Sequence, residues 1–545
     1  MKRVGILNMG FTGVWLMMLV SLFYLQIVKY GHFRSLALIQ HKKKVELLPK
    51  RGDLYDVSGR LLATSAHCYS AYVLPKYVKN KTKAARQLAQ TGFGSHDELV
   101  RKFNDKTFFW LKRKFDGDEK ATIEKLNIFG VFVENDMKRI YPFGDMFAGI
   151  VGKVNSDNQG TEGLEYELND LLKGEKGYRV FQKRPSGEGF PYHRYPSQEP
   201  KPGMGVYLTI DLDLQEILYE EIKDQVAKSE ATAGMALALD PRTGEILALV
   251  NISPGQPWRN IVITDEFEPG STFKIVTAGA AINKGWKETD MIDARGGNIK
   301  YCGYTINDFR DYGIISFKET FGYSSNVGVV KISKTLDKKQ FALLARNLGF
   351  GERTGIGLPG EAKGNFSVGN ATSNIRFANV CFGQGITITV LQLAQAYAAI
   401  ANGGQMYQPY IIKEIKKDDK TVMRSEPRPV RQAVPKELAL RLVEIMRGVV
   451  DNGTGYKARL DEVSIAGKTG TAQKAVAGEY SHDRITASFV GFLPAQAPGL
   501  LIVIVLDEPK KGKWASDLCA PVFGRAARRI INLPKYNYRL YAKKS

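Results

Sequence analysis

The chain has 545 residues, enough for two or three domains with separate hydrophobic cores. Hydrophobic residues make up 44% and charged residues 24%, an ordinary composition for a folded protein. Lys and Arg number 77 against 56 Asp and Glu, so the formal net charge is +21 and favours an acidic polymer or lipid surface as neighbour. The sequence contains no nucleic-acid-binding module, and nucleic acid is not expected as a partner.

The cysteine and histidine spacing argues against a metal site. The four cysteines are widely separated and include no CxxC pair, which disfavours a zinc site or a disulfide scaffold: Cys68, Cys302, Cys381 and Cys519. None of the six histidines has HExxH or HxH spacing, so a zinc hydrolase is not expected.

An apolar segment near the N-terminus predicts a membrane anchor. It runs from Val4 to Val28, about 25 residues, and spanning a bilayer takes roughly 20. The apolar core of a cleavable signal is shorter, roughly 7–15 residues, so we expect an uncleaved signal-anchor within residues 1–30. Because Lys2 and Arg3 precede it, the N-terminus is expected in the cytoplasm and the remaining chain outside it.

Residues 31–228 are expected to form a first extracytoplasmic domain of mixed structure. Their patterns predict short strands within 45–63, charged helices within 81–125 and a connector rich in Pro and Gly over 184–205. Residues 211–228 predict an amphipathic helix that begins at an acidic cap.

Residues 229–535 are expected to form a second domain, followed by a basic tail over 536–545. Strand pairs are predicted near both ends of this domain, at 235–239 and 245–250 and at 485–493 and 500–506. The sequence between these pairs is mostly helical, as in 389–402. This order predicts an α+β fold in which distant segments close one antiparallel sheet.

The second domain contains three short motifs that carry the candidate chemistry. The first, Ser271-Thr272-Phe273-Lys274, follows Pro-Gly and precedes helical sequence. We therefore expect Ser271 at a helix N-terminus, where free N–H groups favour developing negative charge. Because positions i and i+3 share a helix face, Lys274 is expected to hydrogen-bond Ser271 Oγ and, with its pKa lowered by burial, to act as the base.

The second motif is Ser324-Ser325-Asn326. A hydroxyl and an amide at i and i+2 can both point into one cleft from a loop. Ser324 is expected to relay a proton toward the leaving amine, and Asn326 to hold the substrate amide. Taken alone, the motif also fits an ordinary turn or helix cap.

The third motif, Lys468-Thr469-Gly470-Thr471, is typical of an edge strand, with Lys468 and Gly470 on one face. Lys468 is expected to bring positive charge to the cleft, and Gly470 to let substrate approach the backbone. Thr469 and Thr471 offer hydroxyls for a substrate carboxylate. The N–H groups of Thr471 and Ser271 would form an oxyanion hole. Together the three motifs predict a serine acyltransferase whose nucleophile is activated by lysine.

In these motifs the chain resembles the class B penicillin-binding proteins, over nearly its whole length. The three motifs look like the active-site boxes of that family, and 382–385 and 489–492 resemble further parts of its transpeptidase domain. Three other strings resemble its non-catalytic pedestal: 51–56, 139–142 and 163–165. Glu268, before Pro-Gly-Ser, and the residues 325–328 look like the cell-division (septal) type.

The resemblance implies a peptidoglycan D,D-transpeptidase, with a β-lactamase-like sheet covered by helices on both faces and an elongated pedestal of the dimerisation type. Ser271 would attack the D-Ala-D-Ala amide of a stem peptide, release D-alanine and pass the acyl group to an amine of a neighbouring stem. β-Lactams would acylate the same serine. Implied partners are a polytopic glycan polymerase and other division proteins, at the bacterial cytoplasmic membrane with a periplasmic catalytic domain. No metal or organic cofactor is implied.

Two other functions stay open. One is hydrolysis, by a D,D-carboxypeptidase or a β-lactamase. The string Glu165-Tyr166-Glu167-Leu168-Asn169 matches the β-lactamase element that activates water, but it precedes Ser271 where that element follows the serine. The other is a β-lactam-binding scaffold or sensor without turnover. A sensor needs a cytoplasmic output, which the three residues before the anchor are too few to supply.

Overall fold

The computed structural model describes residues 2–183, 189–191, 197–476 and 479–536. The chain forms two compact units, each made of separate segments. The first unit comprises Met1–Arg51, His67–Met137 and Lys173–Gly203, and the second comprises Gly52–Ala66, Lys138–Leu172 and Met204–Ser545. The domain limits predicted at 30, 228 and 535 stay a prediction. Of the predicted tail, only Tyr536 lies within the described residues.

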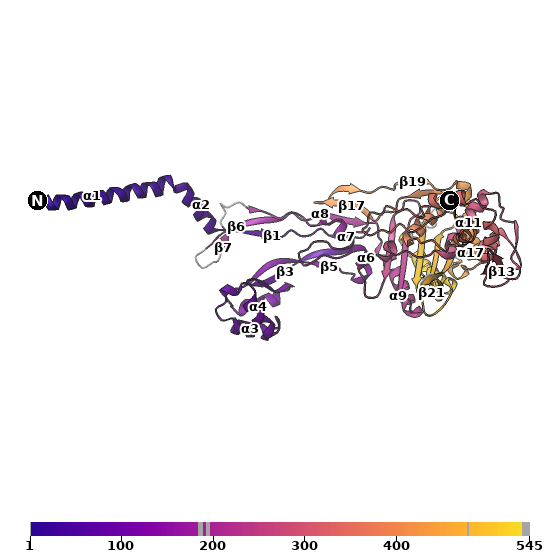
Figure 1. The fold of residues 1–545 in the computed structure, drawn as a ribbon, viewed down its shortest axis with the longest axis horizontal. Helices are drawn as coiled ribbons and strands as arrows, with labels where there is room; N and C mark the ends of the chain where they lie inside the picture. Colours follow the sequence, from indigo (N-terminus) through magenta and orange to yellow (C-terminus); the bar gives the residue numbers. More distant parts are fainter. Residues whose placement is uncertain (1, 184–188, 192–196, 477–478, 537–545) are drawn as a thin grey trace. The chain divides into compact units, whose positions relative to one another are not determined.

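The first unit begins with a long apolar helix, labelled α1 in Figure 1. α1 spans Lys2–Phe23 and continues as a π-helical turn, η1, over Tyr24–Val28. The apolar stretch Val4–Val28 has 25 residues and a mean hydropathy of 1.9. By length and composition it can cross a bilayer, as the sequence predicted.

The rest of the first unit combines antiparallel strands with short helices. Strands β1 (Lys42–Leu47), β6 (Gly177–Lys183) and β7 (Gly189–Pro191) pair in that order, and β8 (Ser197–Gln198) pairs with β6. Helices α3 (Lys81–Gln90), α4 (His96–Asp105) and α5 (Gly117–Lys125) confirm the helices predicted within 81–125. The prediction missed β4 (Phe109–Phe115), because its charged residues were taken for a helix surface. The predicted connector over 184–205 lies partly outside the described residues.

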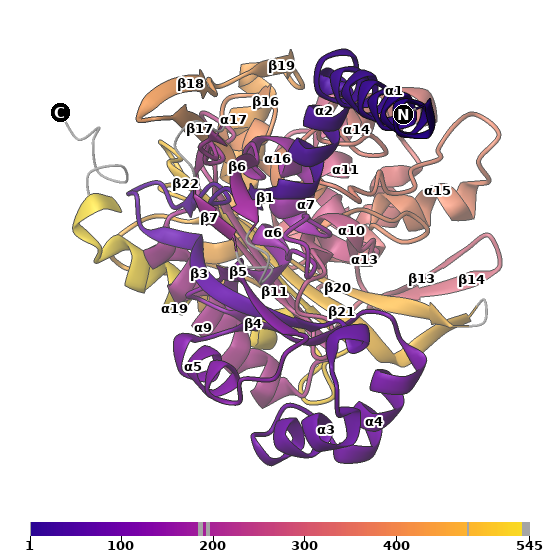
Figure 2. The same ribbon diagram turned by 90° about the vertical axis from the view of Figure 1, so that its left-hand side faces the viewer.

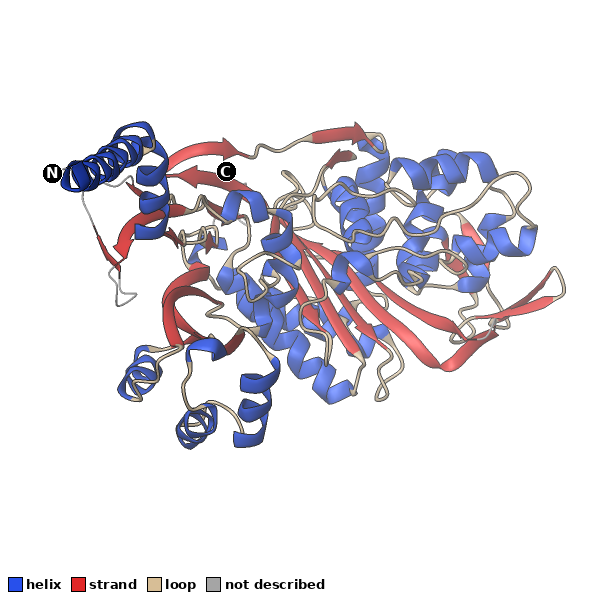
Figure 3. Ribbon diagram, turned by 60° about the vertical axis from the view of Figure 1, so that its left-hand side comes forward, coloured by secondary structure: helices blue, strands red, loops and turns tan. Residues whose placement is uncertain are grey.

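The second unit is built on a five-stranded antiparallel sheet (Figure 3). Its strands, in spatial order, are β11 (Ile246–Ile252), β10 (Ala233–Leu239), β22 (Leu500–Asp507), β21 (Glu479–Leu493) and β20 (Ala466–Val476). Leu237 of β10 pairs with Val503 of β22, so segments from both ends of the domain close the sheet. Both predicted strand pairs and the α+β class are confirmed.

Alternating side chains on these strands enter two separate cores. In Figure 2, helices of this unit lie on either side of the sheet. On one face Leu237 and Val503 join helices α11 (Lys274–Asn283) and α16 (Val390–Ala401). On the other face, residues such as Ala236 and Ile502 join α9 (Leu212–Ser229) and α19 (Ala520–Ile531). The carboxylate of Asp211 accepts a hydrogen bond from the backbone N–H of Asp213, which confirms the acidic cap predicted for α9.

A second group of strands comes from early and late parts of the chain and lies wholly or, in the case of β3 (Leu61–Val73), partly in the same unit. β2 (Leu54–Tyr55) pairs with β3 and with β9 (Gly205–Leu208). On its other side β9 pairs with β17 (Ile412–Lys417), which pairs with β18 (Lys420–Arg424). Helices α6 (Asp145–Val151) and α7 (Gly163–Glu167) follow. Nearby, Arg139 Nε donates a 2.6 Å hydrogen bond to Glu165 Oε1, so two of the pedestal strings meet in a buried ion pair.

Candidate active site

The first motif lies on a 3-10 turn that leads into the buried helix α11. This turn, η3, spans Gly270–Phe273. Ser271 is half-buried, whereas residues 272–279 are buried. The buried hydroxyl of Tyr397, on α16, donates a 2.6 Å hydrogen bond to the carbonyl of Thr272. The turn that carries the candidate nucleophile is therefore fixed to the core.

The second motif begins helix α13 (Asn326–Ser333). Ser324 has a φ of +62°, in the left-handed region that is costly for a residue with a Cβ. Ser325 caps the helix, and its hydroxyl donates a 2.6 Å hydrogen bond to Asp308 Oδ2. The other oxygen, Oδ1, accepts the N–H of Val327 at 3.1 Å. Asp308 thus holds the turn in the conformation that presents Ser324.

The third motif lies on β20, the edge strand of the sheet, and contacts the serine turn through glycines. A Cβ on Gly470 would lie 2.6 Å from Ser488 Oγ and 2.8 Å from the carbonyl oxygen of Pro269. A Cβ on Gly270 would lie 3.0 Å from the carbonyl oxygen of Thr471. In this structure Gly470 therefore permits close approach between the strand and the serine turn.

The threonine hydroxyls of this strand have protein partners. Thr469 Oγ1 lies 2.6 Å from Thr454 Oγ1, and Thr471 Oγ1 accepts a 3.1 Å hydrogen bond from the N–H of Ala515. A hydroxyl can donate one hydrogen bond and accept two, so both groups keep capacity for a substrate carboxylate.

Two lysines from distant segments meet at Ser324. Lys274 Nζ donates hydrogen bonds to Ser324 O at 2.6 Å and to Asn326 Oδ1 at 2.7 Å. Ser324 Oγ lies 3.2 Å from Lys274 Nζ and 3.0 Å from Lys468 Nζ. The three motifs therefore converge. Among the described residues, Lys274 makes these bonds with the second motif and none with Ser271 Oγ, because the carbonyl, hydroxyl and amide oxygens there satisfy its three N–H donors.

Burial sets the charge of both lysines. Lys274 is 0% and Lys468 is 2% exposed. Burial lowers the pKa of Lys274 to about 7, against the opposing pull of Asp308. Burial, with the neighbouring Lys274, also lowers the pKa of Lys468 well below its usual value. Near neutral pH a fraction of Lys274 is therefore unprotonated and available as a general base.

Sequence reasoning missed two groups that shape this site, Asp308 and Tyr397, and assigned Gly383 no contact with the serine turn. Asp308 follows the hairpin of β13 (Asn298–Tyr301) and β14 (Tyr304–Asn307), and no local spacing signals its role. The carbonyl of Gly383 accepts the N–H of Gly270 at 3.0 Å, and a Cβ on Gly383 would lie 2.0 Å from the carbonyl oxygen of Gly270. Only the 382–385 string, noted for its resemblance, pointed to this contact.

Comparison with known proteins gives matches over both units. Residues 234–528 match the penicillin binding protein transpeptidase domain, and residues 46–208 match the penicillin-binding protein dimerisation domain. The chain is 31% identical over 540 residues to stage V sporulation protein D of Bacillus subtilis, covering 94% of this chain and 83% of that protein. It is 30% identical over 519 residues to peptidoglycan D,D-transpeptidase FtsI of Escherichia coli, covering 91% and 85%.

Among solved structures, the fold is similar to penicillin-binding protein 3 from Mycobacterium tuberculosis complexed with aztreonam. The TM-score is 0.70 at 27% identity, and the match covers 91% of this chain and 98% of that chain.

Proposed function

Because the chain belongs to the class B penicillin-binding proteins, we propose that it is a serine peptidoglycan D,D-transpeptidase that cross-links stem peptides. The observation that carries the proposal is the convergence of Lys274 Nζ and Lys468 Nζ on Ser324 Oγ, at 3.2 and 3.0 Å. In this arrangement a buried lysine amine can act as the base, and the Ser324 hydroxyl between the two lysines can relay a proton.

In the proposed reaction Ser271 Oγ attacks the D-Ala-D-Ala carbonyl and Lys274 accepts the hydroxyl proton. The N–H groups of Ser271 and Thr471 stabilise the oxyanion. The C–N bond breaks as Ser324 passes its proton to the leaving D-alanine amine and takes the proton held by Lys274 in exchange, while Lys468 donates a hydrogen bond to Ser324 Oγ. An amine from a neighbouring stem then attacks the acyl-enzyme, forms the cross-link and frees Ser271. Asn326, Thr469 and Gly470 orient the substrate backbone and carboxylate.

The proposal includes a septal role in cell division, supported by the septal type of sequence at Glu268. The apolar helix α1 would anchor the chain in the cytoplasmic membrane with the second unit on the periplasmic side. A polytopic glycan polymerase and other division proteins would be its partners, and β-lactams would acylate Ser271 as dead-end substrates.

Labelling with a fluorescent penicillin tests the nucleophile. Ser271→Ala is expected to abolish covalent labelling while circular dichroism and the melting temperature stay those of the wild type. Ser253→Ala is the matched control and should label normally, because this half-buried serine lies outside the three motifs. Persistent labelling of Ser271→Ala would place the nucleophile elsewhere.

Acyl transfer with a stem-peptide donor distinguishes the transpeptidase from the hydrolase. Water and an amine acceptor compete for the acyl-enzyme, and cross-linked product should dominate. Dominant hydrolysis would favour a carboxypeptidase, and labelling without either product would favour a scaffold.

A further inference from the structure

The positive charge of the chain is concentrated in the first unit. The segments of this unit contain 29 Lys and Arg against 13 Asp and Glu, so they carry +16 of the total of +21. The same unit contains α1, the helix that is long and apolar enough to cross a bilayer. A basic unit that is tethered in this way is held close to anionic lipid headgroups, which attract Lys and Arg side chains.

The cations are densest around helix α3. Between His67 and His96 the sequence has five Lys and Arg and no Asp or Glu. Four of the five are exposed and one, Lys81, is half-buried. None of them forms an ion pair with a described residue, so their charges are available to an anionic surface. They lie on the 3-10 turn η2 (Pro75–Tyr77), in the loop after it and on α3: Lys76, Lys79, Lys81, Lys83 and Arg86.

Helix α3 keeps its cations at the surface because its other side is apolar. Ala84, Ala85 and Leu88 are buried in a small core that also contains residues of α4. Lys83 and Arg86 are three positions apart, so they share the opposite, exposed face of the helix. Packing of the apolar side therefore turns these two cations toward solvent.

Two exposed aromatic rings adjoin these cations. Tyr77 is 41% and Phe129 is 65% exposed, and their rings make an edge contact with centroids 5.9 Å apart. Lys76 Nζ lies 4.8 Å from the centre of the Tyr77 ring. Exposed aromatic rings beside Lys and Arg are typical of segments that lie in the headgroup region of a bilayer. We call the five cations with Tyr77 and Phe129 the α3 patch.

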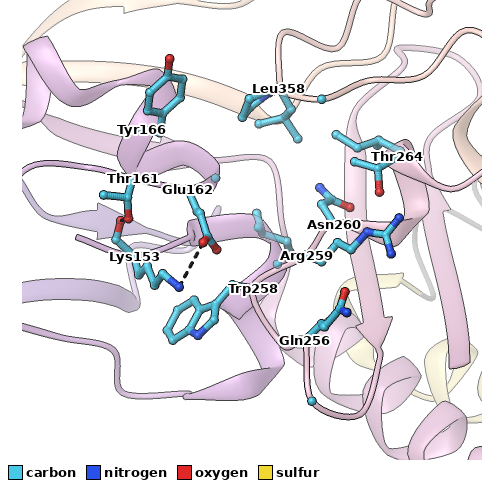
Figure 4. Close-up of a pocket in the computed structure, with 17 residues that line it drawn as sticks. Lys153, Thr161, Glu162, Tyr166, Gln256, Trp258, Arg259, Asn260, Thr264 and Leu358 are labelled. Carbon is cyan, nitrogen blue, oxygen red and sulfur yellow. Dashed lines mark hydrogen bonds and ion pairs between the residues drawn. The ribbon is translucent and has the colours of Figure 1, made fainter. Parts of the chain in front are cut away.

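The second unit shows how cations look when the protein itself neutralises them. Figure 4 shows a pocket of that unit with Lys153 and Arg259 in its lining. Lys153 Nζ lies 3.0 Å from Glu162 Oε1, and Arg259 Nη2 lies 2.6 Å from Asp265 Oδ1. These charges already have partners, whereas those of the α3 patch have none among the described residues. The α3 patch is therefore the better candidate for an anionic partner.

We propose that the α3 patch docks on the anionic lipid surface of the membrane that α1 spans. The rings of Tyr77 and Phe129 enter the headgroup region, and the cations bind lipid phosphates. Each Lys or Arg near such a surface strengthens docking about fivefold. The inference goes beyond the proposed reaction and requires only the membrane anchor. Docking restrains the first unit against the bilayer.

Full-length protein in lipid nanodiscs tests the proposal. Thr82→Cys places a thiol on α3 between Lys81 and Lys83, and Cys302→Ser removes the exposed cysteine, since the other three cysteines are buried. An environment-sensitive dye on this thiol should emit at shorter wavelength in discs with about 30% phosphatidylglycerol than in discs of phosphatidylcholine alone. Acrylamide should also quench it at least about twofold less there, and roughly 0.5 M salt should remove both differences.

Removing charge from the patch should abolish these differences. The triple variant Lys76→Gln, Lys79→Gln, Lys83→Gln should weaken docking roughly 10²-fold, at about fivefold for each lysine. Phe129→Ala should weaken it a few-fold and leave its dependence on salt unchanged. The matched control replaces three exposed lysines of the second unit by Gln and should dock like the wild type: Lys417, Lys420 and Lys436.

An equal dye response in both kinds of disc, or equal effects of the patch triple and the control triple, would overturn docking on lipid. Protection of the dye by soluble poly(glycerol phosphate) but not by anionic discs would also overturn it, and would indicate a phosphate-rich polymer as the partner. Penicillin labelling of the same samples should be normal, because the patch lies outside the three motifs. Loss of labelling with docking intact would contradict only the proposed reaction.

Discussion

Two pairs of buried charged residues in the second unit differ in whether a counter-charge accompanies them. Arg139 and Glu165 form an ion pair at 2.6 Å, with side chains 1% and 0% exposed. Lys274 and Lys468 are equally buried, but neither forms an ion pair among the described residues, and the charge of Lys274 lowers the pKa of Lys468. Burial with a counter-charge stabilises one conformation, whereas burial without one gives a lysine that releases its proton near neutral pH.

The largest effect is expected from replacing Lys274, a buried lysine without a counter-charge among the described residues. Lys274→Ala should lower the rate of acylation by a fluorescent penicillin by roughly 10²–10⁴, because it deletes the proposed general base. Lys284→Ala, an exposed lysine just after α11, is the control and should acylate at the wild-type rate. A Lys274→Ala rate within a few-fold of the wild type would remove this lysine from the base role.

Breaking the buried Arg139–Glu165 ion pair should lower the stability of the fold and not the rate of acylation. Glu165→Ala leaves Arg139 buried without its carboxylate and should lower the free energy of unfolding by about 3–5 kcal/mol. Urea denaturation measures this loss. Asp224→Ala breaks the exposed Lys228–Asp224 pair, at 2.7 Å, and should cost about 0–1 kcal/mol. Equal effects of the two substitutions would contradict the importance of burial.

The pH dependence of acylation should report the titration of Lys274. Since its pKa is lowered to about 7, the proton leaves as pH rises through about 7, and the amine that acts as base becomes more abundant. The acylation rate should therefore rise about tenfold between roughly pH 6 and 8 and then level off. A rate that is constant over this interval would be inconsistent with a titrating lysine base.

The smallest effect is expected from neutralising Asp308, the carboxylate whose charge acts on Lys274. Asp308 opposes the fall in the pKa of Lys274, so Asp308→Asn should move the inflection to lower pH, by less than about one unit. Asp311→Asn changes an exposed carboxylate three residues later and should leave the inflection in place. An upward shift for Asp308→Asn would reverse the proposed electrostatics.

Local signals predicted much of the fold, because caps, turns and strand alternation depend on neighbours in the chain. The acidic cap of α9 and the pairs β10–β11 and β21–β22 were found in this way. Contacts between distant residues were not predicted. Tyr397 bonds to Thr272 across 125 positions, and Asp308 anchors a helix on another segment. The predicted hydrogen bond between Lys274 and Ser271 Oγ was wrong for the same reason, because oxygens of Ser324 and Asn326, distant in sequence, accept the hydrogen bonds of Lys274 Nζ.

The glycine contacts around the serine turn restrict which substitutions the site tolerates. A side chain at position 383 would collide with the carbonyl oxygen of Gly270 at 2.0 Å, and one at 470 would strike Ser488 and Pro269. Variants that resist antibiotics yet still build cell wall should therefore not arise at these two positions. Mutational escape should instead accumulate where side chains have space, such as Phe309, which is 72% exposed and adjoins Asp308.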